Sequence, residues 1–137
     1  MTSNFGTVSF EPFTPTELLG QWRVDESTTV SREAARLGVA GSQMREDLEY
    51  GGYLGVMITF DEGSFALIYD GETAPRHVGS YTHAAGIPCG INQLWLQFTW
   101  DEMIAQPYQY LLLTQQDGDT LEIEWPNDRF VHYRRHS

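Results

Sequence analysis

From Tyr53 onward the chain alternates apolar and polar side chains in short runs, and turn residues separate one run from the next. An alternation with a period of two puts successive side chains on opposite faces of an extended strand, so each run predicts a β-strand with one buried face. The connections between the runs are short and carry glycine, proline or aspartate. The strands expected from this pattern cover residues 53–60, 64–69, 77–84, 93–100, 108–114, 120–125 and 129–135.

One more strand comes before these, after a short capped turn. Thr14 and Glu17 have the spacing of a capping box, and Pro15 suits the first position of a helical turn. Gly20 stops this turn, and residues 21–24 continue as a strand.

The only long connection lies between the first two strong strands and carries most of the helical signal. Helix formers followed by a stopping glycine predict a helix over residues 31–38, with Ser31 as its N-cap. A second helix is expected over residues 42–50, with Ser42 as its N-cap. Near the N-terminus, weak alternation over residues 7–13 suggests an extra edge segment.

Eight strands joined in sequence by short connections favour an all-β fold, an eight-stranded up-and-down antiparallel barrel, because closure leaves no strand edge exposed. An open sandwich would need longer crossovers than the chain offers after residue 53. With 41% hydrophobic residues, residues 1–137 are expected to form a single domain. The 4 Trp, 7 Tyr and 7 Phe exceed what such a core requires, so we expect some of them to line a cavity.

The charge balance argues against several classes of partner. Eight basic and 19 acidic residues give a formal net charge of -11, which disfavours nucleic acids and anionic membrane surfaces. The acidity fits a soluble surface, or an acidic inhibitor or immunity-type protein with a basic partner.

A single cysteine leaves no internal disulfide framework. Neither a signal-peptide pattern nor an apolar run of membrane-spanning length is visible, so a cytoplasmic protein is expected.

Both ends of the chain resemble one known group of barrels. Gly20-Gln21-Trp22 fits the Gly-x-Trp signature at the first strand of lipocalins and their relatives in the calycin group. The stretch "LLGQWRV" resembles the opening of bacterial lipocalin-like domains, and "DGDTLEIEWPNDRFVHYRR" resembles their last hairpin with its terminal basic residue. The likeness implies a lipocalin-like barrel. The helical segment between the first two strands is more similar to the lid of fatty-acid-binding proteins.

In such a barrel the first strand lies beside the eighth, which places Trp22 near Arg134 or Arg135 at one end. A guanidinium stacked on the indole would close that end and contribute about 0.5–2 kcal/mol. We take Arg134 as this arginine. His132, two residues earlier on the same face, would then point into the cavity above Trp22.

The cavity is expected to lie between this floor and a helical lid over residues 28–50. No metal site or cofactor is expected, since the four histidines and one cysteine form no close ligand pair. Glu122 and Glu124 alternate with apolar residues and are expected to face water.

If the barrel is catalytic, Tyr81, His83 and His132 are the candidates for polarising a carbonyl group. The residues expected to contact a ligand are Tyr69, Tyr81, His83, Trp100, Tyr110, Trp125 and His132.

The leading functional prediction is the binding of a small, mostly apolar molecule inside the barrel, because eight strands enclose about enough space for one such ligand. The alternative is a cofactor-independent cyclase or isomerase of natural-product biosynthesis on the same barrel, where a shaped cavity holds one reactive conformer. The acidic inhibitor is a further alternative. The sequence leaves the identity of the ligand and the oligomeric state, including a homodimer, open.

Overall fold

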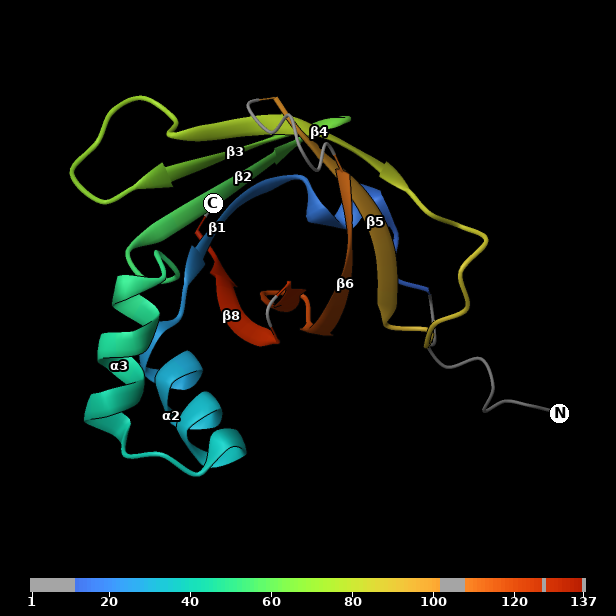
Figure 1. Cartoon of the computed structure of the whole chain (residues 1–137). Coiled ribbons are helices and arrows are strands. Elements are labelled where there is room, and N and C mark those ends of the chain that lie inside the picture. The colour runs from blue at the N-terminus through green and yellow to red at the C-terminus, as the bar shows by residue number, and fades with distance from the viewer. Residues whose placement is uncertain (1–11, 102–107, 127, 137) are drawn as a thin grey trace, which may run out of the picture.

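The computed structural model describes residues 12–101, 108–126 and 128–136 and shows a closed antiparallel barrel of eight strands (Figure 1). Each strand pairs with its neighbours in the chain, and β8 pairs with β1, so the predicted fold class is confirmed. Of the edge segment expected over residues 7–13, residues 7–11 lie outside the described part and residues 12–13 belong to no strand. The strands are β1 (Gly20–Val24), β2 (Val56–Asp61), β3 (Ser64–Tyr69), β4 (His77–His83), β5 (Gln93–Trp100), β6 (Tyr108–Asp117), β7 (Thr120–Trp125) and β8 (Arg129–Arg135).

Two α-helices separate β1 from β2, as predicted, but both begin earlier than the sequence suggested. The first begins after Asp25, whose carboxylate accepts a hydrogen bond from the Thr28 amide at 3.3 Å, and not at Ser31. The second begins after Ala40 and not after Ser42. None of the described helices is long and apolar enough to cross a membrane. The helical elements are η1 (Pro15–Leu18, a 3₁₀ turn), α2 (Glu26–Leu37) and α3 (Gly41–Tyr50).

Trp22 closes the end of the barrel beside η1, which we call the closed end. Its side chain is fully buried, and its Nε1 donates a hydrogen bond to the carbonyl oxygen of Leu18 at 2.8 Å. Gly20 has a φ of 121°, a backbone conformation open to glycine, and this lets the chain pass from η1 into β1 within two residues. The Gly-x-Trp sequence therefore joins the capping turn to the barrel.

Arg135, and not Arg134, is the arginine that stacks on Trp22. Its guanidinium carbon lies 4.2 Å from the centroid of the indole, and its NH groups donate to the carbonyl oxygens of Leu19 and Glu17. Trp22 and Arg135 lie directly opposite in the register of β1 and β8, so their side chains share the inner side of the sheet. Arg134 therefore points outward, where its Nε contacts a carboxylate oxygen of Asp25 at 2.9 Å.

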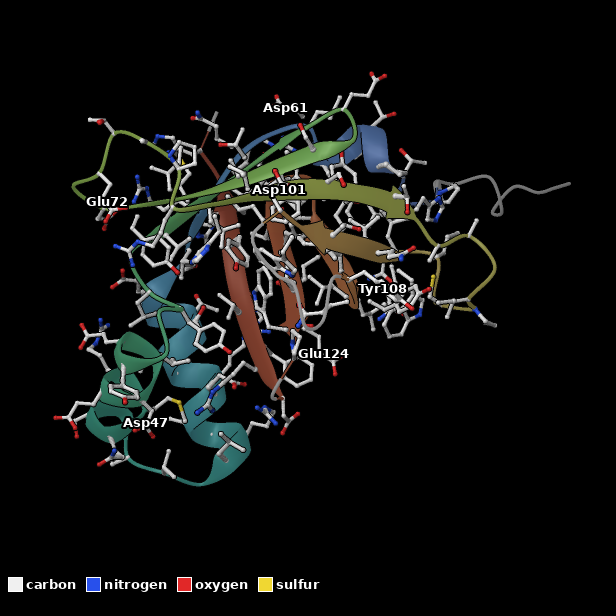
Figure 2. All side chains as sticks on the ribbon, turned by 45° about the horizontal axis from the view of Figure 1, so that its top comes forward. Asp47, Asp61, Glu72, Asp101, Tyr108 and Glu124 are labelled. Carbon is white, nitrogen blue, oxygen red and sulfur yellow. The ribbon has the colours of Figure 1, made fainter. Side chains whose placement is uncertain are left out.

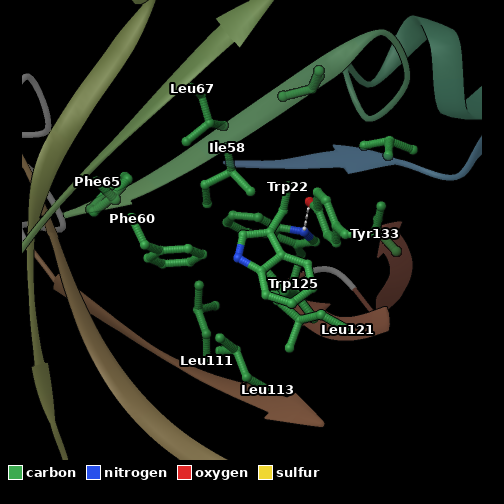
Figure 3. Packing of buried hydrophobic residues seen from close by; sticks show 14 of the residues in the cluster. Trp22, Ile58, Phe60, Phe65, Leu67, Leu111, Leu113, Leu121, Trp125 and Tyr133 are labelled. Atoms are coloured by element: carbon green, nitrogen blue, oxygen red, sulfur yellow. Dashed lines mark hydrogen bonds between the residues drawn. The ribbon is translucent and has the colours of Figure 1, made fainter. Parts of the chain in front are cut away.

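Apolar side chains fill the interior from the closed end to the middle of the barrel (Figure 3). Phe65 packs against Phe98 with ring centroids 4.4 Å apart. Gly79 makes this packing possible, because a Cβ at that position would lie 2.2 Å from the carbonyl oxygen of Thr99 and 2.8 Å from the ring of Phe65. Other side chains with almost no exposure in this region are Ile58, Phe60, Leu96, Leu111, Leu113, Leu121 and Ile123.

Trp22→Ala should lower the free energy of unfolding by about 3–5 kcal/mol, because it leaves a large void in a packed interior. Urea unfolding followed by circular dichroism measures this loss without relying on tryptophan emission. A loss below about 1 kcal/mol would contradict the closing role of Trp22.

The two arginines provide a matched comparison for the same end of the barrel. Arg135→Gln removes the cation from the indole and from two carbonyl groups, and we expect a loss of about 1–3 kcal/mol. Arg134→Gln breaks an ion pair whose arginine side chain is 65% exposed and should cost less than about 1 kcal/mol. Equal losses would show that stacking on Trp22 does not stabilise the closed end.

Candidate functional site

The barrel contains a recess of about 320 Å³ at the end opposite η1. Residues far apart in the sequence meet there because antiparallel neighbours pair at this end, as Val56 does with Tyr69 and Trp125 with Arg129. The three residues that follow α3 complete its wall. The recess is lined by Gly51, Gly52, Tyr53, Val56, Leu67, Tyr69, His77, Trp100, Gln109, Trp125, Pro126 and Tyr133.

Aromatic rings form a large part of this lining. The rings of Trp100 and Trp125 lie 6.2 Å apart between centroids and are tilted by 39°. His77 meets Trp100 edge to face at 6.1 Å, and Tyr69 lies 6.3 Å from His77. Such rings offer a large apolar contact area with little loss of side-chain freedom, so the recess suits an apolar or aromatic molecule.

The polar groups of the recess are mostly held by neighbours. Trp100 Nε1 donates to Gln109 Oε1 at 3.0 Å, and Tyr69 donates its hydroxyl proton to the carbonyl oxygen of Gly52 at 2.9 Å. Trp125 Nε1 donates to the hydroxyl oxygen of Tyr133 at 2.9 Å (Figure 3). These bonds fix the rings in place, which is how a binding site is kept in shape before a ligand arrives.

Burial favours the uncharged form of two tyrosines of the recess, Tyr69 and Tyr133. The desolvation of the buried Tyr133 raises the pKa of its hydroxyl well above the usual range. Desolvation also raises the pKa of Tyr69, although the nearby cation of Arg76 opposes it. The Arg76 guanidinium carbon lies 4.0 Å from the centroid of the Tyr69 ring. Among the described residues, no carboxylate, lysine or arginine lines the recess.

Three of the predicted ligand-contact residues lie together in the recess, namely Tyr69, Trp100 and Trp125. Their inward direction follows from the strand alternation, and their role in binding stays a prediction. The recess occupies only the end of the barrel, because Phe65 and Phe98 fill the space between it and Trp22. The cavity expected to reach the Trp22 floor is therefore shorter than predicted.

Tyr81 and His83 lie at the closed end, away from the recess. Tyr81 points inward, and its hydroxyl donates to the carbonyl oxygen of Asp61 at 2.7 Å. His83 is exposed at the last position of β4 and borders a separate hollow with Glu62. The two side chains share one face of β4, as expected, but that strand runs from the recess toward the closed end. They therefore do not line the recess, but both line the separate hollow, and the expectation that they present a hydroxyl and an imidazole to the same ligand stays a prediction.

Tyr110 lies on the outside of the barrel and does not line the recess. Its side chain is about half exposed, and its ring meets that of Tyr108 edge to face at 6.0 Å. Leu111 and Leu113 fill the inner face of β6 and are fully buried, which leaves the outer face to Tyr110.

His132 also points away from the recess and lies under α2. Its backbone amide donates to the Thr29 hydroxyl oxygen at 3.0 Å, and its Nε2 is 3.3 Å from Glu122 Oε2. Glu122, expected to face water, is thus partly covered by the helix. The inward residue is instead the neighbouring Tyr133, because the pairing of Trp22 with Arg135 sets the alternation of β8.

The helical pair lies beside the barrel, with α2 packed against β8 and α3 packed against α2 (Figure 1). Buried Glu33 on α2 receives two hydrogen bonds of 2.7 Å from Arg36 and lies 3.9 Å from Arg129 of β8. The guanidinium of Arg36 also lies over the ring of Phe130, 4.7 Å from its centroid. The pair borders the recess through the residues that follow α3, beginning at Gly51.

The recess also contains functional candidates that the sequence did not single out. These are Tyr53, His77, Gln109 and Tyr133. Choosing Arg135 as the arginine that stacks on Trp22 would have identified Tyr133 from the sequence, since these two residues share a face of β8. Within residues 12–101, 108–126 and 128–136, no three His, Cys, Asp or Glu side chains gather closely enough to hold a metal ion.

Comparisons of the chain with protein-family models, with curated proteins and with solved structures gave no match. The class of protein is therefore defined by its geometry. It is an eight-stranded up-and-down antiparallel barrel with an aromatic recess at one end and a helical pair beside β8.

The position of His132 makes the stability of the fold depend on pH. Burial is the main reason why the pKa of His132 lies below its ordinary value of 6.5, and the nearby Arg32 lowers it further. Below pH 6.5 the unfolded chain therefore binds a proton that the folded chain resists, and stability falls as the pH decreases toward the folded pKa. The free energy of unfolding should decrease more between about pH 7.5 and 5.5 in the native protein than in His132→Gln.

His83→Gln serves as the control, because His83 is an exposed histidine on another strand. This variant should keep the pH dependence of the native protein in the same urea titrations. If His132→Gln also keeps it, the buried imidazole does not oppose protonation.

Proposed function

We propose that the protein binds a small, mostly apolar molecule in the recess and that it is a lipocalin-like barrel of the calycin group. The observation that carries the binding proposal is the joint presence of Trp100, Trp125 and Tyr69 around a cavity of about 320 Å³. Mostly apolar pockets with a few placed polar groups are typical sites for small ligands.

The lining favours a ligand whose polar end is uncharged. Gln109 and the tyrosine hydroxyls can exchange hydrogen bonds with a carbonyl, hydroxyl or amide group. An ionised ligand would find no opposite charge among the described lining residues, and burying an unpaired charge costs several kcal/mol.

The closed end supports the assignment to the calycin group. The Gly-x-Trp sequence places Gly20 at the bend and Trp22 under a basic residue of the last strand, Arg135. This arrangement agrees with the resemblance of both chain ends to lipocalin-like domains.

Titration with an apolar anilinonaphthalene probe tests the proposed site. We expect about one probe per chain, quenched tryptophan emission, and at least fivefold weaker binding by Trp100→Leu, because this change removes one aromatic wall of the recess. Trp95→Leu is the matched control, since Trp95 lies on the outer face of the same strand and should change the dissociation constant less than about twofold. Absence of probe binding, or equal weakening by both variants, would contradict the proposal.

A cyclase or isomerase remains the second candidate, and one observation favours it. His77 brings an imidazole, the side chain most often used as a general acid or base, to the edge of Trp100 in the recess. Tyr81, His83 and His132 lie elsewhere, so His77 replaces them as the catalytic candidate.

Deuterium exchange into small enolisable ketones, followed by NMR, would reveal such proton transfer. His77→Gln should abolish the exchange and keep probe binding if the site is catalytic.

The acidic inhibitor is supported only by the net charge of -11. Its partner would be a basic protein bound at the acidic surface, independently of the recess. A chain that binds no probe but associates with basic proteins would favour it.

A further inference from the structure

The outer side of the barrel is divided into a charged part and an uncharged part. The outward side chains of β3, β4 and β5, and those of β6 up to Thr114, carry no charge. We call this surface the neutral wall. It covers four adjacent strands of a chain whose formal net charge is -11.

The charges are concentrated elsewhere. In Figure 2 the labelled acidic residues lie on α3 (Asp47), at the ends of strands or in turns (Asp61, Glu72, Asp101), and on β7 (Glu124). The outer face of β7 carries a second carboxylate, and the outer faces of β8 and β1 carry arginines. The neutral wall is therefore a distinct surface and does not simply reflect the average composition.

Exposed aromatic side chains lie on the neutral wall. Tyr108 and Tyr110 are 48% and 49% exposed, and both stand on the outer face of β6. Trp95 and Leu112 lie opposite each other across β5 and β6, directly beside Tyr110. Val78 extends the apolar surface onto β4 and is 37% exposed. Tyrosine and tryptophan are enriched, and charged residues depleted, at the centres of protein interfaces.

The charge distribution indicates which partner this surface fits. A basic partner would gain most from the acidic faces and least from the neutral wall. A second copy of the chain carries the same net charge of -11, so two copies repel each other wherever their charged faces meet. The neutral wall is the part of the barrel surface where two copies approach with the least repulsion.

The size of the surface sets the strength of the contact. Four strands spaced about 4.8 Å apart and about seven residues long give a face of about 20 by 23 Å, or roughly 450 Å² per copy. Because these four strands curve around half of a closed barrel, two such faces can bury at most about 900 Å² in total, which is below the usual range for stable complexes. We propose that the neutral wall is the contact surface of a weak homodimer in which the β3–β6 faces of two copies pack around a twofold axis.

Analytical ultracentrifugation of the full chain between about 5 and 500 µM tests this proposal. We expect a reversible monomer–dimer equilibrium with a dissociation constant on the order of 10–100 µM. Raising the salt concentration from about 20 to 300 mM should strengthen the dimer, because salt screens the repulsion between the acidic faces.

Two substitutions of an exposed tyrosine separate the neutral wall from the rest of the surface. Tyr110→Glu places an unpaired charge on the neutral wall of each copy, where the contact would exclude water, and should weaken the dimer at least tenfold. Tyr50→Glu makes the same change at a residue of α3 that is 96% exposed, and it should leave the equilibrium within about twofold of the native one. Circular dichroism checks that both variants are folded.

Several outcomes would overturn the homodimer. One is a chain that stays monomeric up to 500 µM at both salt concentrations, and another is equal weakening by Tyr110→Glu and Tyr50→Glu. A dimer that weakens as salt is added would indicate a contact between opposite charges. A monomer that dimerises only after removal of residues 1–11 would assign the neutral wall to that segment.

Discussion

The stacking of Arg135 on Trp22 determines much of the remaining structure. It fixes the register in which the first strand meets the last, and a shift of one residue would turn every side chain of β8 to the opposite face. Because Arg135 points inward, Tyr133 points inward as well and reaches the recess, while His132 lies outside and contacts α2. The contact at the closed end thereby determines which residues of β8 line the recess at the opposite end.

The division of the interior into a packed part and a recess has a similarly local cause. Gly79 leaves room for the ring of Phe65 to lie against the strand, and Phe98 packs on that ring. These residues fill the interior between the recess and the closed end and so keep the open volume near one end. The aromatic side chains of the sequence thus serve two purposes, since some fill the core and others, such as Trp100 and Trp125, surround the recess.

The strand pattern was sufficient to predict the barrel. It also predicted which side chains point inward on strands that have one apolar and one polar face. On β5, Leu94, Leu96, Phe98 and Trp100 share one face and all point inward.

On β8 both faces carry an aromatic ring and an arginine, so the pattern alone could not choose between His132 and Tyr133. On β6 both faces are apolar, which is why Tyr110 was misplaced. The start of α2 was missed because serine and threonine obscure its helical signal.

Closure of the barrel also determines how the chain can acquire its structure. The hydrogen bond from Arg135 to Leu19 joins residues separated by 116 positions, and every hydrogen bond between β1 and β8 spans a similar length. Contacts so distant along the chain form slowly, because most of the polypeptide must be ordered before they add stability. During synthesis, one edge of β1 therefore has no partner until β8 has left the ribosome. The nascent sheet carries an open edge until then, and that edge is where association with other chains would begin.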